Sequence, residues 1–274
     1  MFFKDVVGQE ELKKRLIQSV QDERISHAQL FSGPEGTGKL AMAIAYAQYI
    51  SCKNRTETDS CGVCPSCHKY NKLAHPDLHF VFPIFNTAKV SKPVSDDFIK
   101  EWREMVLNNP YFDLGSWLTF IEADNAQGLI YERESDSIYK KLNLKSFESE
   151  FKVMIIWLPE KMHAFCSNKL LKLIEEPPNK TLFILITEDE EAIIPTIRSR
   201  AQLINFPFID KESIRAALLE MEDANWDLIP DAVHLANGNF IKAKAYINPG
   251  EDEQFYFQKF QEMMRYAYNR EVLE

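Results

Sequence analysis

A glycine-rich turn near the start of the chain constrains the fold more than any other sequence feature. The segment Gly33-Pro34-Glu35-Gly36-Thr37-Gly38-Lys39 joins a strand-like run, His27–Phe31, to a helix-forming stretch, Leu40–Ile50. Glycines in such a turn let backbone N–H groups converge on phosphate oxygens, and the lysine adds a positive charge beside the helix N-terminus. An accidental glycine-rich turn is the alternative, but the strand-to-helix context favours a phosphate loop. The candidate phosphate-binding residues are Gly33, Gly36, Thr37, Gly38 and Lys39.

The loop lacks the residues that hold magnesium in sites that hydrolyse ATP. Leu40 stands where the pattern requires Ser or Thr, and leucine cannot coordinate a hard cation. The apolar run ending at Ile156 should be followed by metal-holding and water-activating carboxylates, but Trp157 and Leu158 follow it. Glu160 lies farther on, behind a proline, and we expect it to be a solvated surface acid. Magnesium-dependent hydrolysis is therefore not expected, whereas the glycines and the lysine leave binding of ATP or ADP open.

Apolar runs of strand length alternate with helical patterns as far as Pro207. Continuous apolar runs are typical of strands buried on both faces, and their alternation with helices favours a parallel sheet covered on both sides. The expected strands are His27–Phe31, Leu78–Phe82, Val153–Leu158, Thr181–Thr187 and Ala201–Phe206. The expected helices include Leu40–Ile50, Asp96–Leu107, Ser135–Leu142 and Ala164–Glu175. The fold class is therefore α/β.

The pattern changes after Pro207, where short helices follow one another without strands. They are expected at Lys211–Met221, Leu228–Ala236 and Ile241–Tyr246, and a further helix is expected within Asp252–Glu274. We therefore expect a first domain over residues 1–208, a small helical domain over 209–250 and the start of a third unit over 251–274.

An insertion near residues 86–130 of the first domain is rich in aromatic side chains. We expect these side chains to pack a small satellite core, and a partner-binding face is the alternative. They are Trp102, Tyr111, Phe112, Trp117 and Phe120.

Four cysteines are spaced as metal ligands. Cys52, Cys61, Cys64 and Cys67 lie close together in the chain, and two-residue turns present pairs of thiolates to one ion in tetrahedral zinc sites. Four thiolates close a structural site, so we expect structural zinc over residues 52–67. The alternative is a set of unrelated reduced thiols. The fifth cysteine, Cys166, stands alone in a helical segment and is expected to pack in the core.

The net charge of −9 argues against a protein that binds DNA over its whole surface, because such binding relies on Lys and Arg to neutralise the phosphates. The N-terminus shows no secretory signal, and the apolar runs are too short to span a membrane. We therefore expect a cytoplasmic protein with no membrane partner.

Several segments together resemble bacterial DNA polymerase III clamp-loader subunits. These are Phe2-x2-Asp5-Val6-Val7-Gly8-Gln9, the His27-Ala28 strand entry, the four-cysteine insert after the phosphate-loop helix, Asn168-Lys169-Leu170-Leu171-Lys172-x2-Glu175-Glu176-Pro177-Pro178, and Ile197-Arg198-Ser199-Arg200. The resemblance implies an AAA+ fold with a five-stranded parallel sheet, a zinc-binding insert and a small helical lid. It also implies a helical collar of which residues 251–274 would be only the start, and we expect that the chain is truncated there.

Within this family the gamma/tau subunits keep an intact ATPase site and the delta-prime subunit does not, so Leu40 and Trp157-Leu158 resemble delta-prime. The resemblance implies a sensor position at Thr187, and it implies a sensor arginine in the lid that this chain lacks, although Lys242 lies nearby. It further implies that Arg200 is an arginine finger that acts in trans on ATP held by a neighbouring subunit; pairing with a local carboxylate is the alternative.

The implied partners are gamma/tau-type and delta-type subunits within the DNA polymerase III holoenzyme, and through them the sliding clamp and primer-template DNA. The expected function is that of a non-catalytic subunit in clamp loading during DNA replication. Two alternatives are a gamma/tau-type motor with an atypical site and an interaction module outside replication that reuses the fold.

Overall fold

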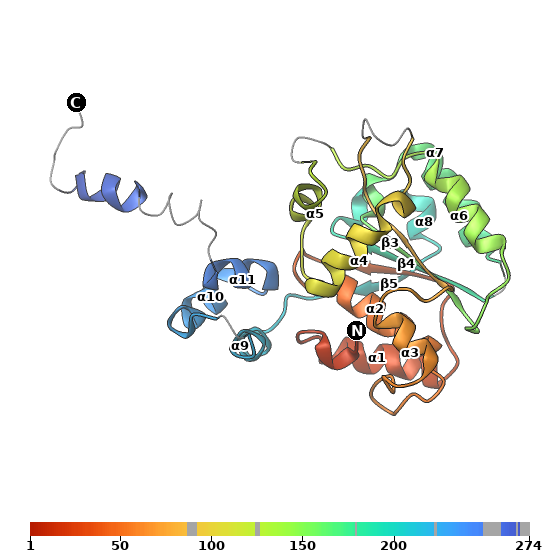
Figure 1. Ribbon diagram of the computed structural model, residues 1–274, viewed down its shortest axis with the longest axis horizontal. Helices are drawn as coiled ribbons and strands as arrows, with labels where there is room; N and C mark the ends of the chain where they lie inside the picture. Colours follow the sequence, from red (N-terminus) through yellow and green to blue (C-terminus); the bar gives the residue numbers. More distant parts are fainter. Residues whose placement is uncertain are drawn as a thin grey trace.

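Five parallel strands form a sheet in the order β2-β3-β4-β1-β5 (Figure 1). The computed structural model describes residues 1–86, 92–123, 127–178, 180–221, 224–248 and 259–266, together with Tyr268. The strands are β1 (Ala28–Ser32), β2 (Leu78–Val81), β3 (Lys152–Trp157), β4 (Thr181–Thr187) and β5 (Gln202–Asn205). Every pairing between neighbouring strands of this sheet is parallel. The predicted five-stranded parallel sheet is confirmed, and each predicted strand agrees with the observed one to within one residue at either end.

Helices cover both faces of the sheet. Successive side chains of a strand point to opposite faces, so Ile155 and Ile184 enter one hydrophobic core while Met154 and Phe183 enter the other. The first core is covered by α1 (Glu10–Gln21), α2 (Lys39–Ser51), α3 (Pro65–Tyr70), α4 (Ile99–Asn108) and α5 (Leu114–Phe120). The second core is covered by α6 (Glu134–Asn143), α7 (Ala164–Glu175) and α8 (Pro195–Arg198).

The aromatic insertion joins the first core instead of forming a core of its own. Trp102 and Trp117 are fully buried, and the Trp102 ring lies 5.3 Å from that of Trp157 at the end of β3. The prediction that these aromatics pack is confirmed: four of them are buried, and Phe120, which is 41% exposed, stacks on the ring of Trp117. The prediction of a separate satellite core is wrong, because Trp157 makes the insertion continuous with the core of the sheet.

Three helices follow the sheet as predicted, α9 (Lys211–Leu219), α10 (Ile229–Ala236) and α11 (Phe240–Ile247). Figure 1 shows them gathered beside the sheet, and we refer to them as the lid. Asp210 caps α9 by accepting a hydrogen bond from the Ser213 amide (2.8 Å), and Asn237 ends α10 in the left-handed conformation. Residues 259–266 are helical, and the rest of the helix expected within 251–274, apart from Tyr268, lies outside the described residues.

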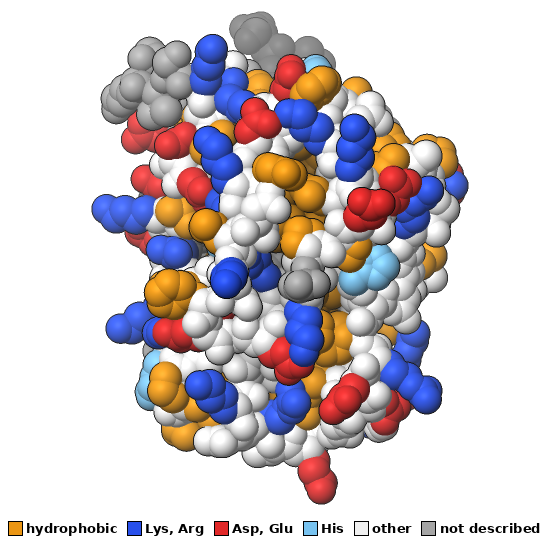
Figure 2. All heavy atoms as spheres, turned by 90° about the vertical axis from the view of Figure 1, so that its right-hand side faces the viewer, with side chains coloured by type: hydrophobic (Ala, Val, Ile, Leu, Met, Phe, Trp, Pro, Cys, Tyr) orange, Lys and Arg blue, Asp and Glu red, His pale blue; other side chains and the backbone are white. Residues whose placement is uncertain are grey.

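The surface carries charges of both signs close together. On the face shown in Figure 2, Lys and Arg side chains are interspersed with Asp and Glu, so the described residues form no continuous basic stripe across this face. Among the described helices, none combines the length and the apolar character needed to cross a membrane.

Asp77, which immediately precedes β2, fixes the segment that leads into β3. Its carboxylate accepts hydrogen bonds from the backbone amides of Phe147, Glu148 and Ser149 at 2.7–2.8 Å. Burial opposes ionisation, but these three amides outweigh it and lower the pKa of the Asp77 carboxyl below its ordinary value. The bonds tie β2 and β3 together at the amino edge of the sheet.

We expect Asp77→Asn to lower the free energy of unfolding by about 2 kcal/mol near pH 7, because three amides lose a charged acceptor. A lowered carboxyl pKa stabilises the fold above the unfolded-state pKa of about 4, and this contribution is lost as the pH falls through the folded-state value. The difference between wild type and variant should therefore shrink near pH 3. Urea denaturation at both pH values measures it, and Asp231→Asn, an exposed acid on α10, is the control. Equal losses for the two variants would contradict the assignment.

Candidate phosphate loop and metal centre

The predicted phosphate loop lies at the carboxyl edge of the sheet, between β1 and α2. Gly36 and Gly38 have φ angles of 73° and 82°, in the left-handed region that favours glycine, and Gly38 is the N-cap residue that immediately precedes α2. The Thr37 hydroxyl donates to the carbonyl of Pro34 (2.8 Å), which closes the loop on itself. The structure therefore brings all five predicted loop residues together in one turn.

The ammonium group of Lys39 is hydrogen-bonded within its own loop. Its Nζ donates to the carbonyl oxygens of Gly33 (2.7 Å) and Pro34 (2.5 Å). Burial lowers the pKa of Lys39 to about 8, although the carboxylates of Glu188, Glu160 and Glu35 act in the opposite direction. The lysine is thus a buried cation held by backbone carbonyls and surrounded by acids.

The positions that would hold magnesium are apolar and packed. Leu40, Trp157 and Leu158 are only 6%, 4% and 2% exposed, and the Trp157 ring lies 5.2 Å from that of Phe112. None of the three offers an oxygen ligand, as predicted from the sequence. Burial also excludes the water that would complete the shell of a hard cation at these side chains.

The prediction that Glu160 is a freely solvated surface acid is wrong. Pro159 begins a short 3₁₀ turn, Pro159–Lys161, that folds the carboxylate back toward the sheet, where Oε1 accepts a hydrogen bond from the Glu188 amide (3.1 Å). Burial raises the pKa of Glu160, and it raises that of Glu188, which the charge of Lys39 partly offsets. The predicted sensor residue Thr187 lies in the same place, with its hydroxyl donating to the Asp189 carbonyl (3.0 Å).

The space over the phosphate loop is small. The cavity there measures about 30 Å³, room for one or two waters, whereas ligand clefts usually measure about 300–1,000 Å³. Tyr111 and Phe112 of the insertion, Trp157 of β3 and Ile241 of the lid line it. From the sequence, Tyr111 and Phe112 are expected in a satellite core or, as the alternative, on a partner-binding face, and no local pattern marks them as neighbours of the loop.

Arg200 lies at the opposite edge of the sheet from the phosphate loop. It lies in the turn before β5, whose first residue, Gln202, pairs with Gln29 of β1, whereas Gly33 follows the end of β1. The four residue levels from Gln29 to Gly33 alone span about 13 Å at about 3.3 Å per residue. The guanidinium is partly exposed and pairs with Glu175 (2.8 Å), the local contact considered as the alternative to a role in trans.

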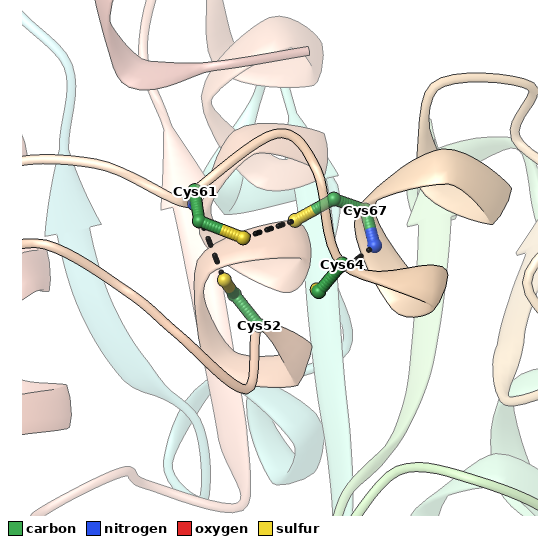
Figure 3. Close-up of side chains that lie close together, drawn as sticks. All are labelled: Cys52, Cys61, Cys64 and Cys67. Carbon is green, nitrogen blue, oxygen red and sulfur yellow. Dashed lines mark hydrogen bonds between the residues drawn. The ribbon is translucent and has the colours of Figure 1, made fainter.

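The four predicted metal-binding cysteines converge (Figure 3). Cys52 follows α2, Cys61 lies in the connecting loop, and Cys64 and Cys67 lie at the start of α3. Cys64 caps α3 by accepting the Cys67 amide hydrogen bond at 3.5 Å, and the Cys52 sulfur accepts that of Cys61 at 3.2 Å. Burial opposes ionisation of Cys64, but the amides of Cys67 and Lys53 lower the pKa of its thiol to about 6.

The geometry of the cluster fits a tetrahedral ion. The four sulfurs all lie within 4.8 Å of one another, and those of Cys61 and Cys67 are 4.0 Å apart. Zinc–sulfur bonds of about 2.3 Å require sulfur–sulfur separations of about 3.8 Å. The cluster therefore suits a closed four-thiolate metal site, while Cys166 is buried in the second core as predicted.

A known protein family matches most of this chain. The family model described as "DNA polymerase III, delta subunit" matches residues 8–210. The delta' subunit of DNA polymerase III from Bacillus subtilis is 28% identical over 215 residues, which are 78% of this chain and 52% of that protein. The gamma/tau subunit from Mycobacterium bovis is also 28% identical, over 85% of this chain and 33% of that protein. The chain thus spans a third to a half of the length of these relatives.

A DNA polymerase III gamma-subunit-related protein from Thermotoga maritima is a structural neighbour, with 18% sequence identity and a TM-score of 0.48 over 88% of this chain and 59% of that one. The match of the family model covers most of the chain and includes both the phosphate loop and the cysteine cluster. This chain belongs to the DNA polymerase III delta-subunit family of AAA+ clamp-loader proteins.

Proposed function

We propose that this chain is a non-catalytic clamp-loader subunit of the delta-prime type. It assembles with gamma/tau-type and delta-type subunits as part of the DNA polymerase III holoenzyme. In that assembly it acts in the cytoplasm in loading the sliding clamp onto primer-template DNA. This role is the one that the resemblance of the chain's motifs to clamp-loader subunits implies.

The observation that supports this proposal most directly is the burial of Leu40, Trp157 and Leu158. A motor subunit needs oxygen ligands at these positions, and three packed apolar side chains replace them here. The gamma/tau and delta' relatives are equally identical to this chain, so overall similarity does not separate the two types, whereas these side chains favour delta-prime.

We propose that Arg200 is the residue through which this chain assists ATP hydrolysis, and that it acts in the site of a neighbouring subunit. Arg200 lies far from the chain's own phosphate loop, so it can contact a phosphate that a neighbouring subunit holds. An arginine supplied in this way stabilises the charge that develops on the transferring phosphoryl group. Its ion pair with Glu175 is partly exposed, and exposed pairs contribute about 0–1 kcal/mol. The guanidinium also donates to the Thr196 carbonyl (3.0 Å) and the Ser199 hydroxyl (3.3 Å), and both contacts are exposed. The arginine can therefore exchange these partners for a phosphate at low cost.

A motor of gamma/tau type with an atypical site is the second candidate. The observation that favours it is the position of Glu160, which lies near Lys39 instead of in solvent. For this second function, Glu160 would replace the carboxylate that is absent at Trp157 and Leu158, and the isolated chain would hydrolyse ATP.

We also propose that the cysteine cluster holds structural zinc. Zinc would supply a closed, four-thiolate cross-link between the end of α2 and the start of α3. A closed set of ligands leaves no position for substrate, so we assign no catalytic step to it.

Arg200→Ala should lower DNA-stimulated ATP hydrolysis in a complex reconstituted with cognate gamma/tau-type and delta-type subunits. The loss at the neighbouring site should be about a thousandfold or more, the usual value of an arginine finger. Arg198→Ala is a matched control, because Arg198 is the last residue of α8, lies two residues before Arg200 and pairs with Glu191 (2.7 Å). Gel filtration should show intact assembly for both variants. A rate unaffected by Arg200→Ala in the intact complex would refute the finger role.

Protein purified without added metal should contain about one zinc per chain, as a closed four-thiolate site requires. Cys64→Ser should lose most of the metal and lower the melting temperature, whereas Cys166→Ala should keep the metal. Elemental analysis and thermal denaturation measure the two effects. Folded, reduced wild-type protein without zinc would rule out the assignment.

A further inference from the structure

The side chain of Tyr111 occupies the space directly over the phosphate loop. Its hydroxyl accepts a hydrogen bond from the Val7 amide (2.8 Å). A methyl group on Gly38 would come within 2.9 Å of the same hydroxyl, so the tyrosine lies against the first turn of α2. Its ring meets that of Phe240 edge to face at 4.9 Å. One side chain thus contacts the N-terminal segment, the phosphate loop and the lid.

The backbone beneath Tyr111 holds the ring in this position. Asn109 donates from Nδ2 to the Tyr111 carbonyl (2.7 Å) and accepts from the Tyr111 amide (3.1 Å). The next residue, Phe112, packs on Trp102 and Trp157 in the first core. The tyrosine is therefore presented by a preorganised turn, and little conformational entropy is lost when it contacts the loop.

The lid closes over the loop at the same place. The Phe240 amide donates to the Gly36 carbonyl (3.1 Å), and Asn239 Nδ2 donates to the carboxylate of Glu35 (3.3 Å). With Tyr111 and Phe240 in contact, the cavity over the loop measures about 30 Å³. This is too small for a nucleotide, which would have to displace part of the lining, and Tyr111 is the lining residue that contacts both the loop and Phe240 of the lid.

The N-terminal segment that supports Tyr111 is fastened to the cysteine cluster. The Asp59 carboxylate accepts hydrogen bonds from the amides of Phe3 (3.2 Å) and Lys4 (3.1 Å). Gly62, next to Cys61, lies against the Phe2 ring, where a methyl group would come within 3.1 Å of it. A metal that orders residues 52–67 would therefore also position Val7, the partner of Tyr111.

We propose that Tyr111 is an intramolecular latch that takes the place of nucleotide and holds the lid closed on the phosphate loop, with the cysteine cluster anchoring the latch through residues 1–7. The latch rests on the proposed non-catalytic function, since a motor subunit must release its lid to exchange nucleotide. The position of the lid is then set by the fold and does not respond to ATP.

Hydrogen exchange of the full chain tests the latch. In Tyr111→Ala we expect at least tenfold faster exchange at the amides of Phe240 and Ala243, because the lid loses its contact with the loop. Tyr111→Phe keeps the ring and loses the hydroxyl, so it should show a smaller increase and covers the case in which the alanine variant fails to fold. Tyr139→Ala, an exposed tyrosine of α6, is the matched control and should leave these amides unchanged. Unchanged lid exchange in a folded Tyr111→Ala protein would overturn the proposal.

Two further measurements test its other parts. Tyr111→Ala should bind fluorescently labelled ADP at least tenfold more tightly than wild type, and equal affinities would overturn the claim that the ring takes the nucleotide's place. Removal of zinc by a chelator should speed exchange at the amides of Phe3, Val7 and Phe240, and unchanged exchange at Phe240 would overturn the anchoring role of the cluster. Hydrolysis of ATP by wild-type chain would instead count against the proposed function, so the two failures are distinguishable.

Discussion

The packing of Trp157 against Trp102 and Phe112 determines the character of the carboxyl edge of the sheet. In open α/β sheets this edge is where ligands bind. Here the indole of Trp157 fills the end of β3, where a motor subunit needs a carboxylate, and its packing joins the aromatic insertion to the sheet. The insertion in turn brings Tyr111 to the phosphate loop, so the same indole both occupies the end of β3 and packs against the insertion that covers the loop.

Local patterns were enough to predict much of this molecule. The central strands are continuous apolar runs such as Thr181–Thr187, the loop is defined by its glycines, and the cysteine cluster follows from spacing within one short segment. These features depend on neighbours in the chain. The position of Glu160 could not be read in this way, because the turn at Pro159 folds it back onto Glu188.

The contacts of Tyr111 could not be predicted for a related reason. Its hydroxyl meets the amide of Val7, which lies 104 residues earlier, and its ring meets Phe240 in the lid. Such contacts depend on how separate elements pack, and the sequence around Tyr111 shows only an aromatic side chain suited to a core. The aromatic composition of the insertion therefore predicted burial correctly but not what the buried side chains cover.

The charged side chains at the carboxyl edge and at the amino edge of the sheet differ in how they are paired. At the carboxyl edge, Lys39 is satisfied by its own loop. At the amino edge, Arg200 makes a partly exposed ion pair with Glu175 and solvent-exposed hydrogen bonds to Thr196 and Ser199. This difference suits a chain that assists a neighbour's reaction without carrying one out.

Steady-state ATP hydrolysis by the purified chain tests this account most directly, with Lys39→Ala protein as the background measurement. Because Leu40, Trp157 and Leu158 offer no metal ligand, the account predicts that wild type and variant show the same rate, equal to that of buffer with magnesium and ATP alone. Turnover by wild type that Lys39→Ala abolishes would contradict it.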